Sequence, residues 1–195
     1  MPTKQPISES LRQAHGPVMD WQFLRRHFVR IVIAVVLMAA VYGVVSVYGT
    51  YQREQRIAKA IASHGGDVAF QFAGPDWIPQ TLQDRLPFLD RICRVCQLGP
   101  AVPSDFLCEL GSLHKLEYLH LENTQANDAV LKHFMGLTNL KTLYLNDTQV
   151  TDAGMAHLNG LTNLTCLTLD DTQVTADGRA LLRKSLPNCT IEPTP

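Results

Sequence analysis

A pattern of 24 residues occurs three times in succession between residues 113 and 184, and it constrains the fold more than any other feature. The copies read LHKLEYLHLENTQANDAVLKHFMG, LTNLKTLYLNDTQVTDAGMAHLNG and LTNLTCLTLDDTQVTADGRALLRK. A fixed period of this length is typical of a solenoid, in which each unit buries its apolar edge only against its neighbours. We therefore expect a stack of similar structural units in this part of the chain.

Each copy contains the pattern L-x-x-L-x-x-L-x-L-x-x-T. The paired leucines, such as Leu119 and Leu121, predict a short strand with one buried face, and repetition stacks these strands in parallel. The threonine after each strand predicts a turn in which its hydroxyl bonds the backbone. Asn127 and Thr151 are suited to cap a following helical segment. Apolar residues at helical spacing then predict an inward-facing side, at Leu131, Phe134, Met155 and Leu158.

This pattern resembles the leucine-rich repeat. The stretch TQVTDAGMAHLNGLTNL at residues 148–164 is similar to a 24-residue bacterial subtype, TxVTDAG, in which threonine replaces the asparagine of the general pattern. The resemblance implies an α/β fold: a short leucine-rich repeat solenoid with parallel strands on its concave side and helical segments on its convex side. It implies no particular function, because repeat folds serve many.

The ends of the repeat block depart from the pattern. A degenerate first copy keeps apolar repeat positions at Leu89, Ile92, Val95, Val102, Leu107 and Leu110, whereas Gln97 stands where leucine is expected. In the third copy, Arg179 occupies an inward position, and we expect it to turn to solvent because burial of an unpaired charge is costly. We interpret residues 175–195 as a C-terminal cap, so that the repeat domain covers residues 89–195.

The stretch Ile31 to Tyr48 contains 18 residues without a charge. Its length and all-round apolarity predict a transmembrane helix over residues 29–50, behind a disordered cytoplasmic tail of residues 1–28. A buried core helix and a cleaved signal peptide are the alternatives. The long polar region before the apolar run favours an uncleaved anchor. Arginines 25, 26 and 30 before the span predict a single-pass protein of the bacterial inner membrane with extracytoplasmic repeats.

Residues 51–88 link the span to the repeats. We expect a juxtamembrane helix over residues 51–64 that buries Ile57 and Ile61, ended by Gly65-Gly66. Alternation in residues 67–72 predicts a strand. An apolar lid over the solenoid is then expected from Trp77, Ile78 and Leu82.

The candidate partner-binding surface is the strand face opposite the leucines. Its aromatic and polar side chains are Tyr118, His120, Glu122, Thr142, Tyr144, Asn146, Thr168 and Asp170. Two aromatic residues over an acidic strip suit a basic peptide. The alternative is a solvated face with no partner.

The composition argues against several other functions. The repeats carry eight acidic and six basic residues, which does not suit nucleic acid. The chain contains no nucleophile elbow, P-loop, HExxH or dinucleotide-binding loop, so we predict neither enzymatic activity nor a cofactor. His120, Glu122 and Cys166 lie in different columns of the strand face, so no shared metal ion is predicted.

Five cysteines allow a further set of interpretations. Cys93-x-x-Cys96 could form a redox or metal pair, but residues three apart in a strand point to opposite faces. In an extracytoplasmic domain, a Cys93–Cys108 or Cys96–Cys108 disulfide is an open alternative.

The sequence thus predicts a non-catalytic protein–protein interaction module, anchored in the lipid bilayer through residues 29–50. A structural component of an envelope assembly, with no ligand of its own, is the alternative. A redox protein that uses Cys93 and Cys96 is a third interpretation. The sequence predicts neither the identity of a partner nor the oligomeric state.

Overall fold

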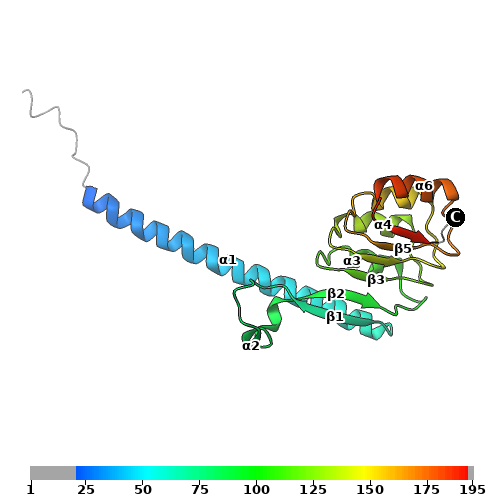
Figure 1. Ribbon diagram of the computed structural model, residues 1–195. Coiled ribbons are helices and arrows are strands. Elements are labelled where there is room, and N and C mark those ends of the chain that lie inside the picture. Colours follow the sequence, from blue (N-terminus) through cyan, green and yellow to red (C-terminus); the bar gives the residue numbers. More distant parts are fainter. Residues whose placement is uncertain (1–20, 193–195) are drawn as a thin grey trace, which may run out of the picture. The chain divides into compact units, whose positions relative to one another are not determined.

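The computed structural model describes residues 21–192, with side chains from residue 27 onward, and divides the chain into two compact units, residues 1–46 and 47–195 (Figure 1). Most of the expected tail of residues 1–28 lies outside the described residues. The helices are α1 (Trp21–Ser63), α2 (Gln80–Gln83), η1 (Pro87–Leu89), α3 (Ser104–Leu110), α4 (Asp128–His133), η2 (Phe134–Gly136), α5 (Asp152–Met155), η3 (Ala156–Leu158) and α6 (Ala176–Ser185). The strands are β1 (Asp67–Phe72), β2 (Asp90–Cys96), β3 (Tyr118–His120), β4 (Thr142–Tyr144), β5 (Cys166–Thr168) and β6 (Thr190–Glu192).

The strands form one six-stranded sheet in sequence order, as Figure 1 shows. Strands β2 to β6 are parallel, and their register advances by one repeat per strand, so that Leu119, Leu143 and Leu167 are neighbours. Strand β1 pairs with β2 in the antiparallel direction. The parallel sheet with short helices in the connections confirms the prediction of an α/β solenoid.

Leucine side chains between the sheet and the helices form the core. Leu119, Leu143 and Leu145 are completely buried, and so are Leu131 and Phe134 behind them. Because the matching positions of the next repeat are also apolar and buried, every coil buries its apolar edge against its neighbours. The inward side predicted for the helical segments is therefore confirmed.

The predicted turns and caps also form. Thr124 Oγ1 and Thr172 Oγ1 each donate to a carbonyl three residues earlier at 2.7 Å, and Thr148 makes the same bond. Asn127 Oδ1 accepts from two backbone amides of α4, and Thr151 Oγ1 accepts from Ala153 N. These bonds satisfy backbone groups that the change of direction would leave without partners.

A ladder of aspartates joins neighbouring repeats. The Asp128 carboxylate accepts from Thr151 N at 2.8 Å and Thr151 Oγ1 at 2.7 Å, and Asp152 accepts from Thr175 in the same way. A glycine lies three residues after each of these threonines. It leaves room for the aspartate carboxylate, because a Cβ at Gly154 would lie 2.3 Å from Asp128 Oδ1. The Thr-Asp-x-Gly part of the repeat therefore encodes contacts between coils.

The two ends of this ladder explain where the pattern is broken. Ser104 occupies the aspartate position before the first full copy, and Val130 then replaces the glycine. Ala176 occupies the aspartate position of the last copy, which has no following threonine to hold. The reversed order of Ala176 and Asp177 thus marks the last coil.

Arg179 does not turn to solvent, although the sequence predicts it to do so. Its side chain is half-buried, and its Nη1 donates to the Val174 carbonyl at 2.8 Å. This hydrogen bond gives the half-buried guanidinium an acceptor in the last coil. The arginine is therefore part of the C-terminal cap.

The degenerate first coil is present, because β2 pairs with β3 and buries Ile92 and Val95. Gln97 is exposed and has φ 58°, and Leu98 is buried in its place. The same left-handed conformation recurs after the later strands, at Asn123, Asp147 and Asp171. Leu89 is only half-buried, because η1 delivers it at the edge of the core.

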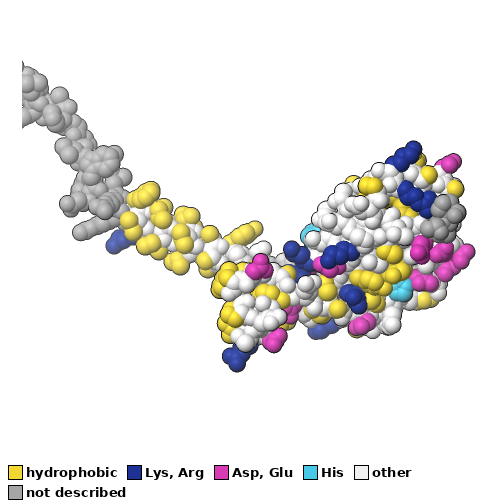
Figure 2. Space-filling view, viewed as in Figure 1, with side chains coloured by type: hydrophobic (Ala, Val, Ile, Leu, Met, Phe, Trp, Pro, Cys, Tyr) yellow, Lys and Arg dark blue, Asp and Glu magenta, His cyan; other side chains and the backbone are white. Residues whose placement is uncertain are grey.

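Helix α1 is one continuous helix over the residues for which the sequence predicts a membrane span at 29–50 and a juxtamembrane helix at 51–64. No proline interrupts it, and Gly65, with φ 78°, follows its end. Residues 27–46 of the first unit are exposed, and Figure 2 shows hydrophobic side chains along this part of α1. By length and composition α1 is able to cross a membrane, although signal sequences share these properties.

Within the second unit, α1 closes the first end of the core. Ile57 and Ile61 are buried there, and the Glu54 carboxylate accepts from Ile92 N at 2.9 Å. The expected apolar lid is wrong for two of its three residues. Trp77 is 80% exposed and Leu82 45%, and only Ile78 is buried, because α1 already covers this end of the core.

Candidate functional site

Alternation along β3, β4 and β5 brings the sequence-predicted site residues to one face. The register aligns Tyr118 with Thr142 and Cys166, and His120 with Tyr144 and Thr168. Glu122, Asn146 and Asp170 follow the carboxyl ends of the same strands. We call these side chains, together with Arg94 of β2, the strand face.

Aromatic rings form the centre of the strand face. The Tyr118 and Tyr144 ring centroids lie 5.5 Å apart at 54°, and the His120 ring lies edge-on to Tyr144 at 5.3 Å. Arg94 Cζ lies 5.0 Å from the Tyr118 centroid, at the distance of a cation–π contact. Burial and the neighbouring Tyr144 raise the pKa of Tyr118, so its phenol is neutral. Such preordered rings offer apolar area at little entropic cost.

Acidic side chains follow the aromatic centre at the carboxyl ends of the strands. His120 Nε2 and Glu122 Oε2 lie 2.9 Å apart, and Asn146 Oδ1 accepts from Asp170 N at 2.9 Å. Asp147, Asp170, Asp171 and Glu192 are exposed. In Figure 2, acidic side chains gather at one edge of the repeats. Among residues 27–192, none of these four carboxylates forms an ion pair.

Thr168 does not belong to the exposed surface that the sequence predicts. It is only 4% exposed, and its Oγ1 has no hydrogen-bond partner. Its register neighbours on the two sides are Tyr144 and Glu192, which carry longer side chains than threonine. The sequence pattern does not predict this burial, because strand β6 adds a neighbour beyond the last recognisable copy.

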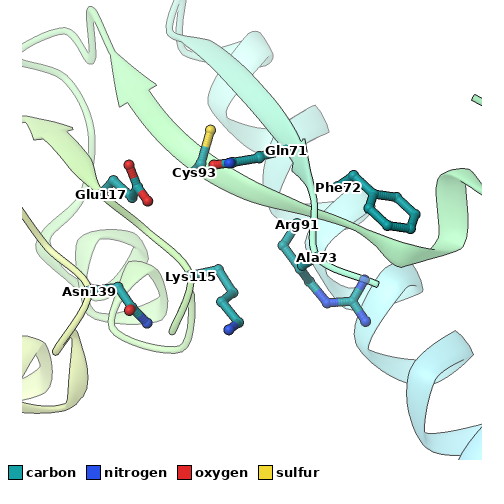
Figure 3. Close-up of a pocket in the computed structure, with 8 residues that line it drawn as sticks. All are labelled: Gln71, Phe72, Ala73, Arg91, Cys93, Lys115, Glu117 and Asn139. Atoms are coloured by element: carbon teal, nitrogen blue, oxygen red, sulfur yellow. The ribbon is translucent and has the colours of Figure 1, made fainter. Parts of the chain in front are cut away.

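A polar hollow of about 180 Å³ lies at the amino ends of the strands, where the cap meets the repeats (Figure 3). In this view Cys93 and Gln71 lie on one side, Glu117 and Asn139 on another, and Arg91 across from them, with Lys115 between Asn139 and Arg91. The lining residues are Gln71, Phe72, Ala73, Arg91, Cys93, Lys115, Glu117 and Asn139. The repeat pattern does not predict this site. The available signal was Lys115, which replaces the asparagine found at positions 139 and 163.

The five cysteines are free, so neither of the disulfides considered from the sequence is formed. Burial and the nearby Glu117 carboxylate raise the pKa of Cys93, whose Sγ donates to the Ala69 carbonyl at 3.4 Å. Burial likewise raises the pKa of Cys96. A redox or nucleophilic cysteine requires a lowered pKa, so nothing about this pair favours the redox interpretation. Within the described part of the chain, no group of three His, Cys, Asp or Glu side chains is arranged to hold a metal ion.

Comparison with known proteins agrees with this architecture. Residues 138–178 match the family described as Leucine Rich repeats (2 copies). The repeat block folds like a leucine-rich repeat domain. Domains with this fold commonly bind protein partners, which makes an interaction module the functional class that the fold suggests.

Two similar solved structures are a leucine-rich repeat protein of Leptospira interrogans and an internalin of Listeria monocytogenes. The first is 29% identical, covers 47% of this chain and 22% of its own, and has a TM-score of 0.37. The second is 27% identical, covers 46% of this chain and 31% of its own, and has a TM-score of 0.35. The match thus spans less than a third of either structure. The search of curated proteins finds no match.

Proposed function

We propose that this protein is a membrane-anchored, non-catalytic interaction module of the 24-residue bacterial repeat type, and that its strand face binds a protein partner. The observation that carries the proposal is the aromatic cluster of Tyr118, Tyr144 and His120, flanked by Arg94. Tyrosine and arginine are enriched among the residues that dominate binding energy at protein interfaces. A half-exposed cluster of this kind on a rigid sheet suits such an anchor point.

The charges next to the cluster suggest the character of the partner. Asp147, Asp170, Asp171 and Glu192 are exposed carboxylates that have no ion pair within the described residues. A basic segment of a partner would complement them, and such complementarity mainly raises the association rate and selects the partner. Binding through the strand face is therefore expected to weaken at high salt.

Residues 29–50 of α1 are the proposed anchor. Apolar side chains on all sides of this stretch, and its length, suit a bilayer span, and arginines before it favour a cytoplasmic N-terminus. Labelling of intact cells with a membrane-impermeant reagent, at a cysteine placed at Ser8 or at Asn188 and read at that residue by peptide mass spectrometry because the native cysteines are free, tests this orientation. Labelling of Ser8 instead of Asn188 would reverse it.

Site-specific cross-linking tests the strand face. A photoreactive residue at Tyr144 of the full-length chain in its membrane is expected to cross-link a defined partner, whereas one at the exposed Lys132 of α4 is not. Substitution of Tyr118 by alanine should reduce the cross-linking at least about tenfold, because an aromatic anchor contributes about 2 kcal/mol. Unchanged cross-linking in the Tyr118 variant, with folding intact, rules out the strand face as the binding site.

A structural role is the second candidate, and the convex side favours it. Leu181 of α6 is 64% exposed beside a groove of about 400 Å³ that also includes Met155 and Leu182. Exposed apolar surface of this kind suits packing into a larger envelope assembly. If cross-links form from Leu181 and none form from Tyr144, the structural role is the better description.

A further inference from the structure

The connection between β1 and β2, residues 73–89, exposes large apolar side chains that the core does not take up. Phe88 is 39% exposed, and Trp77 and Leu82 are more exposed still. Figure 1 shows this connection, with α2, projecting from the start of β2, and Figure 2 shows hydrophobic side chains on it. Large apolar side chains that are exposed together within one short segment mark an interaction site.

The connection is closed and bonded within itself. Ala73 N donates to the Leu89 carbonyl at 3.1 Å, which brings its two ends together, and Gln83 Nε2 donates to the Ile78 carbonyl at 3.1 Å. Between the ends, successive turns pair amides with carbonyls three residues earlier, at Ile78, Leu82, Arg85, Leu86 and Leu89. A segment whose backbone groups are paired in this way can enter a water-poor region at little cost.

Contacts between α1 and β2 show which end of the cap the connection occupies. The Glu54 carboxylate of α1 accepts from Ile92 N near the start of β2. Further along both elements, the Ile61 side chain and the Cys96 carbonyl flank the same glycine. Helix α1 and strand β2 therefore run in the same direction. The connection, which leads into the start of β2, lies toward residues 47–53 of α1.

This position is close to the end of the proposed membrane span at residue 50. Glu54 follows four residues later, which is about 6 Å along a helix, and any tilt of the helix shortens this distance to the hydrocarbon. The headgroup layer is roughly 5–8 Å thick on each side of the hydrocarbon core. The start of β2 thus lies at the outer limit of this layer, and the connection lies on the side nearer the lipid.

We propose that the connection is a second membrane contact, in which Trp77, Leu82 and Phe88 enter the lipid–water interface beside the end of the span. Tryptophan suits this place, because its large ring is apolar and its single N–H can stay hydrated. Leucine and phenylalanine add apolar area to the same contact. The proposal rests on the proposed membrane anchor, and it adds a contact that restricts how the repeats tilt over the bilayer.

The charges of the connection make this contact apolar in character. Asp76 and Asp84 outnumber Arg85, and all three side chains are exposed. Anionic lipid therefore does not attract the connection, and its carboxylates stay in water while the apolar side chains enter. We expect the contact to persist at high salt, in contrast to binding through the strand face.

Tryptophan fluorescence in nanodiscs tests the contact, because the chain contains only Trp21 and Trp77. The full-length chain with Trp21→Phe leaves Trp77 as the sole reporter, and phosphatidylcholine brominated on its acyl chains quenches a tryptophan that touches them. Two reference reporters are placed in a chain with both tryptophans replaced by phenylalanine. Met38→Trp lies in the proposed span, and Met135→Trp lies at an exposed position of η2.

We expect brominated lipid to quench Trp77 and the Met38→Trp reporter and to leave the Met135→Trp reporter unchanged. Bromine near the headgroup end of the acyl chain should quench Trp77 more strongly than bromine near the methyl end, with the reverse order for Met38→Trp. Joint replacement of the exposed Leu82 and Phe88 by serine should reduce the quenching of Trp77 at least about twofold. The matched control Met135→Ser should not change it.

The reference reporters separate failure of this proposal from failure of the anchor. If Met38→Trp is quenched while Trp77 is quenched no more than Met135→Trp, the anchor stands and the second contact is overturned. If Met38→Trp is not quenched, the anchor fails and this proposal fails with it. Protection of Trp77 from aqueous iodide without quenching by brominated lipid would show a protein contact and overturn the proposal. Quenching of Trp77 that survives both serine substitutions would overturn it as well.

Discussion

The interior of the repeat block and its junction with the N-terminal cap are built by different means. In the interior, each stabilising contact recurs after one period: Asp128 holds Thr151 as Asp152 holds Thr175. At the junction the contacts occur once, as in the bond from Ile92 N to Glu54 Oε2. The comparison shows that a short solenoid relies on periodic contacts for its shape and on unique contacts to close its ends.

Substitution of Gly154 by alanine tests the periodic contacts and has the largest expected effect. The added Cβ would meet Asp128 Oδ1 at 2.3 Å and break its bonds to Thr151, so we expect a loss of about 2–4 kcal/mol in the free energy of unfolding. Denaturant unfolding measures this loss. Asp128→Ser imitates the natural Ser104 and Val130 combination, and in the double variant it should recover part of the stability. Additive effects of the two substitutions would contradict the ladder.

Substitution of Glu54 by alanine tests the unique contacts of the junction. It leaves the buried Ile92 amide without an acceptor, for which we expect a cost of about 1–3 kcal/mol. Hydrogen exchange should accelerate first at β1 and β2, while the amides of β4 and β5 stay protected. Glu54→Gln keeps an acceptor oxygen and should have a smaller effect. Equal acceleration throughout the sheet would show that the junction is no separate unit.

The smallest expected effect concerns the opposite end, at Cys189. Burial, and to a lesser extent Cys166, raises the pKa of its thiol from 9.0 to about 11. The unfolded chain therefore releases the proton first, and stability falls as pH rises from about 9 to about 11. At pH 10 this linkage amounts to about 1 kcal/mol. The stability difference between pH 8 and pH 10 should thus be smaller in Cys189→Ala. An identical pH dependence in both proteins would show that the thiol is not the group responsible.

The periodic part of the molecule was predictable because each inference had three examples to support it. The buried leucines, the threonine turns, the Asn127 and Thr151 caps and the alignment of Tyr118, Tyr144 and His120 on one face all follow from local alternation repeated at a fixed interval. The predictions that were wrong concern residues at the two ends of the repeat domain. Trp77 and Leu82 are exposed, Arg179 is half-buried, and Thr168 is covered although its pattern placed it on the surface.

The sequence by itself therefore determined the solenoid, the direction of its strands and the side chains of the strand face, because contacts one repeat apart are visible as a period. Only the tertiary structure decided where the cap and the repeats meet. Arg91 and Lys115 line one hollow because β2 pairs with β1 of the cap on one side and with β3 of the repeats on the other. Such a junction has no second copy in the chain, so no periodicity reveals it.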